Sequence, residues 1–283
     1  MKKIACFFTG GYTESNSMIS FLQKVNPEFQ FSQLCPNRTK KRKSPNGKDL
    51  IDKVSGLTGT ALIRYVCEYI QKYGANLSDI SAVLIEDDLD GRFHEELVLG
   101  DASTVKSKRT ANFNKHCSDT KMLIREKLGK GENFPVILMY ASPEIEAWFV
   151  SDWKNSFGQI YGPKNFCVLS APENEFFSTR FRIHVNRTVL LEYVDHIENY
   201  GYFNGAYKKL SDELIHSIES FKETLTSPKE SSPYAVPILV NRDLYYSKKL
   251  HGDRMLSLLS PDAVYTKCPV YFQEAIDQLR QLI

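Results

Sequence analysis

The sequence predicts an α/β fold with a mainly parallel sheet that is covered by helices. Three apolar runs have the length and continuous hydrophobicity of strands buried on both faces, at residues 3–9, 80–85 and 134–140. Apolar residues also recur at helical spacing, at residues 18–25, 59–73 and 113–128. Strands that alternate with helices over the first 155 residues are typical of a parallel sheet with helices on both faces.

We divide the chain into a core of residues 1–155 and a mixed, mostly helical C-terminal extension of residues 156–283 that packs on the core or completes it. Within the core, residues 29–34 form a further short apolar segment. Residues 37–48 contain no apolar anchor, which predicts an exposed loop. In the extension we expect helices at residues 211–225 and 270–282. Between them we expect a Ser/Pro-rich connection at residues 227–233 and a strand-like run at residues 235–240.

Composition excludes several classes of protein. With 283 residues, 42% of them hydrophobic, the chain can bury a substantial core, and its net charge of +2 leaves any nucleic-acid binding to local patches. The six cysteines form no C-x-x-C pair, which argues against a zinc knuckle or redox dithiol. No apolar run approaches the roughly 18 residues of a membrane helix, and no signal peptide is recognised. We therefore expect a cytoplasmic protein without a membrane partner.

Acidic residues gather directly after the second predicted strand. Glu86, Asp87, Asp88 and Asp90 place four carboxylates within five positions, and their mutual repulsion is costly without a cation. Residues two apart in an extended segment share a face, so either Asp88 with Asp90 or Glu86 with Asp88 could bind one ion. Such hard oxygen ligands suit Mg²⁺ or Mn²⁺. The alternative is an acidic surface turn.

The other two strand ends also carry acidic residues. After the first strand, Gly10 and Gly11 permit a tight turn, and Glu14 opens the next helix, where it either faces the same cleft or stabilises the helix dipole. After the third strand, Ser142 and Pro143 predict a helix start.

Two glutamates lie at that third strand end. Glu144 and Glu146 are about 200° apart around a helix, so we expect one to be a ligand or orienter and the other to face solvent or a basic side chain. Trp148 and Phe149 should pack below the sheet.

Basic residues form two further sets. The run Lys40, Lys41, Arg42 and Lys43 either contacts nucleic-acid phosphates or is a solvated loop. A second set either lines the acidic cleft or forms the polar face of a helix, and it consists of Lys106, Lys108, Arg109 and Lys115.

Several of these motifs together resemble Toprim-like proteins, and more narrowly a bacterial family of unknown function related to the Toprim portions of overcoming-lysogenization-defect nucleases. The family pattern comprises an E-G-x-T-E turn, an aspartate-rich strand end, a P-E-I-E-A-W helix start and a late block of Y-S-K, H-G-x-R and C-P-x-F. The matching segments here are residues 10–14 (GGYTE), 86–90 (EDDLD), 143–148 (PEIEAW), 246–254 (YSKKLHGDR) and 268–272 (CPVYF). The similarity spans almost the whole chain, and the specific motifs are the P-E-I-E-A-W helix start and the late block.

The resemblance implies Mg²⁺-dependent phosphodiester hydrolysis of DNA or RNA, with the aspartates Asp88 and Asp90 holding the metal. It implies catalytic roles for Glu14 and Glu146 as ligand or base, and for Lys248 beside the phosphate. His251 and Arg254 would add positive charge, although His251 could equally be a buried hydrogen-bonding residue. A bacterial role against phage, with an ATPase partner protein, is also implied.

One position departs from the family pattern. Gly10 stands where the family has its first glutamate, the usual base, and glycine can neither accept a proton nor bind metal. Either Glu14 or Glu146 substitutes, or this member has lost hydrolysis and serves as a regulatory or assembly subunit. A small-molecule phosphatase or nucleotide hydrolase is a third possibility.

Overall fold

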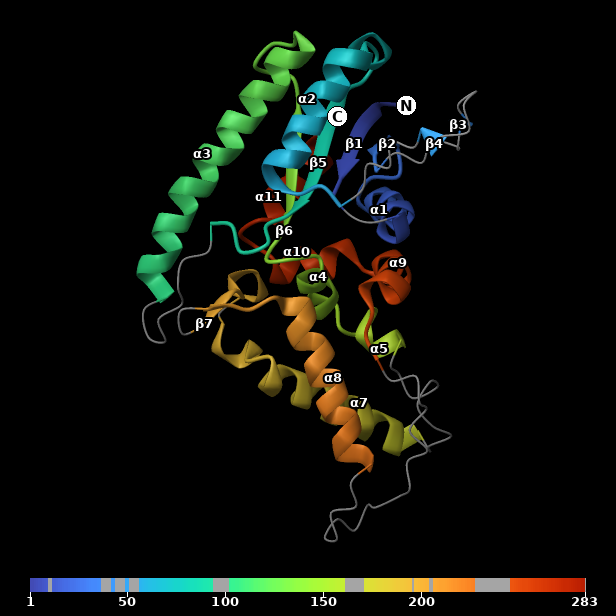
Figure 1. The fold of residues 1–283 in the computed structure, drawn as a ribbon, viewed down its shortest axis with the longest axis vertical. Helices are drawn as coiled ribbons and strands as arrows, with labels where there is room; N and C mark the ends of the chain where they lie inside the picture. Colours follow the sequence, from blue (N-terminus) through green and yellow to red (C-terminus); the bar gives the residue numbers. More distant parts are fainter. Residues whose placement is uncertain are drawn as a thin grey trace.

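The structure is a computed structural model, and it describes residues 1–9, 12–36, 42–43, 49–50, 56–93, 102–160, 171–194, 196–203, 206–226 and 245–282. Its main sheet consists of four parallel strands in the order β2-β1-β5-β6. Their bounds are Lys3–Phe8 for β1, Gln30–Cys35 for β2, Ala82–Asp88 for β5 and Val136–Ala141 for β6. This sheet, with helices on both faces, confirms the predicted fold class (Figure 1).

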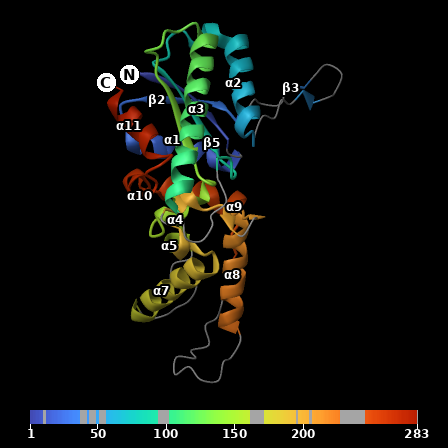
Figure 2. The ribbon, with the colours of Figure 1, turned by 90° about the vertical axis from the view of Figure 1, so that its left-hand side faces the viewer.

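Helices cover the sheet in two layers (Figures 1 and 2). On one face, alternate strand residues such as Val83 and Ile85 pack with α2 (Gly59–Tyr73) and α3 (Ala102–Leu128). On the other face, Ala82 and Leu84 belong to a core shared with α1 (Tyr12–Val25) and α11 (Gln273–Gln281). Strands β1 and β6 and the first four residues of β5 are apolar at nearly every position because both faces are buried.

The C-terminal helices belong to the same hydrophobic core as the sheet. They are α9 (Lys248–Leu258), α10 (Pro261–Lys267) and α11. Two polar contacts tie α9 to α1: Ser17 Oγ donates to Asp253 Oδ1 at 2.6 Å, and Lys24 Nζ donates to the carbonyl oxygen of Leu259 at 2.9 Å. Helix α11 brings the C-terminus back beside the N-terminus, as both ribbon views show.

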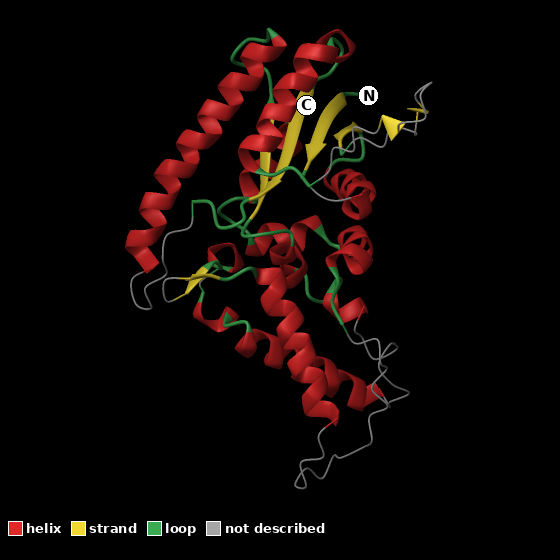
Figure 3. Cartoon of the chain, viewed as in Figure 1, coloured by secondary structure: helices red, strands yellow, loops and turns green. Residues whose placement is uncertain are grey.

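A mostly helical region extends from the carboxyl ends of the strands (Figure 3). It contains α4 (Glu146–Ser151), α5 (Phe157–Ile160), α7 (Ala171–Thr188), α8 (Leu210–Thr226) and the hairpin of β7 (Tyr202–Phe203) and β8 (Ala206–Tyr207). The remaining short elements are β3 (Arg42–Lys43), β4 (Asp49–Leu50) and the 3₁₀ turns Gly74–Leu77, Leu191–Tyr193 and Ile197–Asn199. The predicted run at residues 235–240 lies outside the described residues. No helix among the described residues is long and apolar enough to cross a membrane.

The predicted start of the helix after the third strand is wrong by three residues, because the N-cap is Ile145 and not Ser142. Helix α4 begins at Glu146, and the Ser142 hydroxyl does not cap it, because that hydroxyl donates to the carbonyl oxygen of Glu198 at 2.8 Å. The prediction for the aromatic residues is confirmed. Trp148 is fully buried, 5.7 Å from the Phe21 ring and 4.9 Å from the Phe272 ring.

Glu198 anchors the chain before α11 to the end of β6. Its buried carboxylate accepts three consecutive backbone N–H groups, from Val270 at 2.7 Å, Tyr271 at 3.0 Å and Phe272 at 3.2 Å. Burial raises the pKa of Glu198 to about 7, and the three amide donors oppose that shift. Because the Glu198 carbonyl also accepts from Ser142, one residue connects two distant segments.

We expect Glu198→Ala to lower the free energy of unfolding by roughly 2–5 kcal/mol, because it leaves three amide donors without their acceptor. Urea denaturation followed by circular dichroism measures this. Glu274→Ala is the matched control: Glu274 is exposed and pairs with Lys121 at 3.1 Å, so its loss should cost less than about 1 kcal/mol. An unchanged unfolding midpoint for Glu198→Ala would show that the anchor is unimportant.

Candidate functional site

The candidate site lies where the connections of the main sheet change direction. The helix after β1 leads to β2 on one side, whereas the helix after β5 leads to β6 on the other side. The carboxyl ends of β1 and β5 therefore border a topological switch point, the usual position of ligand sites in open α/β sheets. The acidic residues 86–90 end β5 at this place.

The carboxylates of β5 point to different faces, as strand geometry requires. Asp87 faces α2: its two oxygens each lie 3.1 Å from the N–H of Gly59, the first residue of that helix. Arg92 Nη2 lies 2.6 Å from Asp87 Oδ2 and also donates to the carbonyl oxygen of Asp88 at 2.6 Å. Asp87 therefore fastens the start of α2 and the turn after β5.

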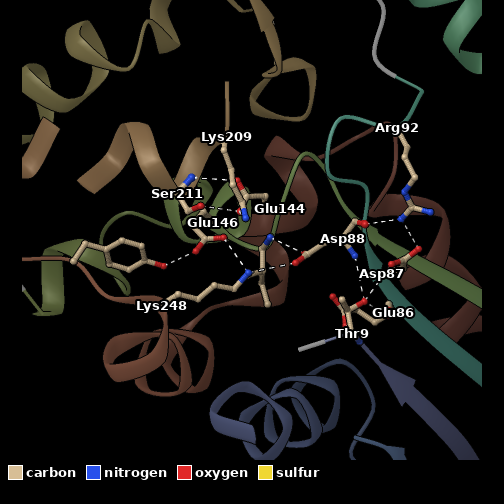
Figure 4. Close-up of polar contacts among 12 residues, drawn as sticks. Thr9, Glu86, Asp87, Asp88, Arg92, Glu144, Glu146, Lys209, Ser211 and Lys248 are labelled. Carbon is tan, nitrogen blue, oxygen red and sulfur yellow. Dashed lines mark hydrogen bonds and ion pairs between the residues drawn. The ribbon is translucent and has the colours of Figure 1, made fainter. Parts of the chain in front are cut away.

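Glu86 is bound to the end of β1. The backbone N–H of Thr9 donates to Glu86 Oε2 at 3.1 Å, and the Thr9 hydroxyl donates to the Glu86 carbonyl oxygen at 2.9 Å. The side chains of Glu86 and Asp87 thus contact β1, α2 and Arg92, whereas the side chain of Asp88 is directed towards Lys248 (Figure 4).

Asp88 and Glu146 converge on one ammonium group (Figure 4). Lys248 Nζ lies 3.3 Å from Asp88 Oδ2 and 3.4 Å from Glu146 Oε2. The other oxygen of Asp88 accepts the backbone N–H of Ile145 at 3.0 Å. The other oxygen of Glu146 accepts the hydroxyl of Tyr246 at 2.8 Å. Each carboxylate is held through one oxygen and directs the other towards a shared cation.

Glu144 adds a third buried carboxylate. It accepts the backbone N–H of Ser211 at 3.2 Å and the Ser211 hydroxyl at 2.9 Å, at the start of α8, and Lys209 Nζ lies 3.9 Å away. Burial, followed by the negative charge of Glu146, raises the pKa of Glu144 to about 7. Of the two surroundings expected for the second glutamate, the basic side chain is confirmed, by Lys209 beside Glu144, whereas solvent is not, since Glu144 and Glu146 are 1% and 0% exposed.

Asp90 lies at the exposed rim of this cluster. Its backbone has a φ of 48°, and its N–H donates to the carbonyl oxygen of Pro143 at 2.8 Å, which joins the turns after β5 and β6. Partial burial and the neighbouring Asp88 raise the pKa of Asp90, whereas Lys209 and Lys248 lower it. The strand pattern predicted that Asp88 would pair with Asp90 or with Glu86. In the structure, the carboxylate that shares a cation with Asp88 is that of Glu146.

The remaining predicted residues fall into two groups. The His251 Nδ1 accepts the backbone N–H of Ser247 at 3.1 Å at the start of α9, and Arg254 is exposed on the same helix. The others lie outside the described part of the structure, either wholly or in their side chains, and they are Gly10, Glu14, Lys40, Lys41, Arg42 and Lys43.

Several residues of the site escaped prediction because their partners are distant in sequence. Tyr246 and Ser211 had no assigned role, yet they bind Glu146 and Glu144 across 100 and 67 positions. Arg92 carried a usable signal, since a basic residue two positions after a run of four carboxylates predicts an ion pair.

The donor chemistry of Asp88 and Glu146 fits Mg²⁺ or Mn²⁺. Two hard carboxylate oxygens face one cation position, and Glu146 Oε2 is fully buried without a hydrogen-bond donor. Magnesium commonly takes only one or two protein carboxylates and completes its shell with water and phosphate oxygens. Within the described residues, no three acidic, histidine or cysteine side chains group closely enough to hold a metal ion. The fit is therefore to an ion held by two protein ligands.

The turn after β5 requires glycine at position 91. Gly91 has a φ of +76°, and a Cβ there would come within 2.6 Å of the Tyr207 ring. We expect Gly91→Ala to lower the free energy of unfolding by roughly 2–4 kcal/mol, from left-handed strain and this clash together.

Two variants separate these contributions in chemical denaturation. In a Tyr207→Ala background the Gly91→Ala cost should fall to about 1–2 kcal/mol, because only the backbone strain remains. Gly129→Ala should show the same small cost, since Gly129 has a φ of +62° and nothing within 4 Å of an added Cβ. Equal costs for Gly91→Ala with and without Tyr207 would refute the contact.

Comparisons of the chain with protein-family models, curated proteins and solved structures gave no match. The Toprim-like resemblance therefore stays a prediction, and the function is inferred from the geometry of the site.

Proposed function

We propose that the protein is a Toprim-like nuclease in which Asp88 and Glu146 hold Mg²⁺ or Mn²⁺ for phosphodiester hydrolysis of DNA or RNA. The supporting observation is that these two buried carboxylates, one at the end of β5 and the other at the start of the helix that follows the neighbouring strand β6, each turn one oxygen towards the same cation position. Repulsion between them has to be relieved by positive charge, and a divalent ion supplies more of it than one ammonium group.

The charges around the site support a divalent ion. Four carboxylates, those of Asp88, Asp90, Glu144 and Glu146, face two ammonium groups. When all are ionised, two negative charges remain; since a pKa of about 7 leaves Glu144 partly protonated at neutral pH, between one and two of these charges are left for a divalent ion to neutralise. The partly exposed Lys209 and Lys248 then provide local positive charge for a phosphate, although the whole chain has a net charge of only +2.

In this proposal the protein side chains bind the ion and hold it in a fixed position relative to the phosphate. Asp88 and Glu146 would bind the ion, and Ile145 N–H and the Tyr246 hydroxyl keep their carboxylates oriented. A bound Mg²⁺ or Mn²⁺ supplies charge neutralisation at the phosphate and lowers the pKa of a coordinated water. Lys248, one-third exposed in its side chain, can reach a phosphate beside the ion. Gly10 stands where the resemblance expects the base, which leaves Glu14 or Glu146 as its substitute; because Glu146 would hold the ion, Glu14 is the proposed base.

The biological setting rests on the resemblance. A role in bacterial defence against phage and an ATPase partner protein are part of the proposal, and co-purification with an ATPase from a defence locus tests them. The basic run at residues 40–43 is the proposed nucleic-acid contact, with His251 and Arg254 as further candidates.

A second function is favoured by the position of Lys248. Its ammonium group already bridges the two carboxylates, and Gly10 replaces the family's first glutamate, as expected of a scaffold that has lost hydrolysis. Such a protein would be a regulatory or assembly subunit of an ATPase complex. A tight ATPase complex, no divalent ion in a high-resolution map and phage protection that survives substitution of Asp88 or Asp90 would support this alternative.

The nuclease proposal predicts opposite results for two adjacent aspartates. With Mg²⁺ or Mn²⁺, the purified protein should cleave plasmid, single-stranded DNA or tRNA, and Asp88→Asn should reduce the cleavage rate by roughly 100-fold or more. Asp87→Asn should leave cleavage largely intact while lowering the free energy of unfolding by about 1–3 kcal/mol, because Asp87 binds Arg92 and the start of α2.

Gel-based cleavage assays and thermal melts on the same samples check both variants. Undiminished cleavage by folded Asp88→Asn would remove Asp88 from the active site. Equal loss of cleavage in both variants, with equal loss of stability, would indicate that the effect comes from unfolding.

A further inference from the structure

The contact of Lys248 with the two carboxylates is looser than their other contacts. Its N–O distances of 3.3 and 3.4 Å exceed the roughly 2.7–2.9 Å of a strong charge-assisted hydrogen bond. Glu146 Oε2 is buried and has no hydrogen-bond partner among the described residues, although the ammonium group lies nearby. The ammonium group neutralises the pair by electrostatic attraction without satisfying both oxygens.

The Lys248 side chain can change position more easily than the two carboxylates can. Its side chain is 33% exposed, and a four-carbon stem can withdraw the ammonium group into water. Asp88 and Glu146 stay in place without it, because Ile145 N–H and the Tyr246 hydroxyl hold their other oxygens. Removal of the ammonium group therefore leaves two oriented oxygens that face one empty cation position.

We propose that Lys248 is an exchangeable counter-ion, which neutralises Asp88 and Glu146 in the metal-free protein and is displaced when a divalent cation binds. This inference rests on the proposed function, because it concerns the same cation position. Among the described residues no group of three metal-ligating side chains occurs, so an ion here would have only two protein ligands, and an ammonium group can take its place. The ion and the ammonium group compete for the same two oxygens.

Competition between the Lys248 ammonium group and the divalent ion leads to a prediction that would not follow if Lys248 only bound phosphate. Without the ammonium group, the metal-free pair of buried carboxylates is left uncompensated, so the free protein loses stability. The same change removes the competitor, so the divalent ion binds more tightly. Metal affinity and metal-free stability should therefore change in opposite directions.

The experiment measures Mn²⁺ binding by calorimetry and by electron paramagnetic resonance, with melting temperatures in EDTA and in Mn²⁺. We expect Lys248→Met to bind Mn²⁺ roughly tenfold tighter or more, to melt lower in EDTA and to gain more from Mn²⁺ than the unmodified protein does. Lys249→Met removes the same charge from the adjacent, exposed position and should bind Mn²⁺ like the unmodified protein.

A third variant keeps the test decisive if Lys248→Met folds poorly. Lys248→Arg retains the charge, and its forked guanidinium donors should grip the carboxylates more firmly, so Mn²⁺ binding should weaken. If the unmodified protein binds Mn²⁺ and Lys248→Met binds it equally or more weakly, the inference is overturned, while the proposed metal site still stands. Absence of Mn²⁺ binding in the unmodified protein and all variants would overturn the metal site itself, and the exchange with it.

Discussion

The buried carboxylates of Asp88 and Glu146 share one cation position, and the surrounding chain is arranged to make that possible. Two like charges in a buried environment repel each other unless a cation and oriented donors compensate them. The donors come from separate segments: the backbone of Ile145 holds Asp88, and the hydroxyl of Tyr246 holds Glu146. The pair therefore depends on the packing of α9 against α1, which brings residues 246–248 to the strand ends.

Local sequence patterns suffice for the sheet and for part of the site. Continuous apolar runs predict β1, β5 and β6, because strands buried on both faces have no polar side to alternate with. Acids that follow parallel strands are expected to meet at one edge of the sheet, and Asp88 and Glu146 do meet there, at the ammonium group of Lys248. The sequence pattern did not decide whether Glu86 or Asp90 would lie beside Asp88 at a common ion.

The errors have a common physical origin in long-range contacts. Strand β5 continues through the acidic residues to Asp88, so Asp87 faces α2 and Arg92 while Asp88 faces α4 and α9. Ser142 resembles a helix cap, but its hydroxyl binds the Glu198 carbonyl oxygen, 56 positions away. Glu144 is buried because the start of α8 covers it. Apart from the ion pair of Asp87 with Arg92, no local pattern encodes these pairings, which depend on how distant segments pack together.

A crystal structure of the protein soaked with Mn²⁺ tests the central claim most directly, because the anomalous signal of manganese locates the ion without assumptions. The account predicts one peak at coordination distance from Asp88 Oδ2 and Glu146 Oε2, with the Lys248 ammonium group moved out of its bridging position. Density without a peak there, and with Lys248 still between the two carboxylates at high Mn²⁺ concentration, would contradict it.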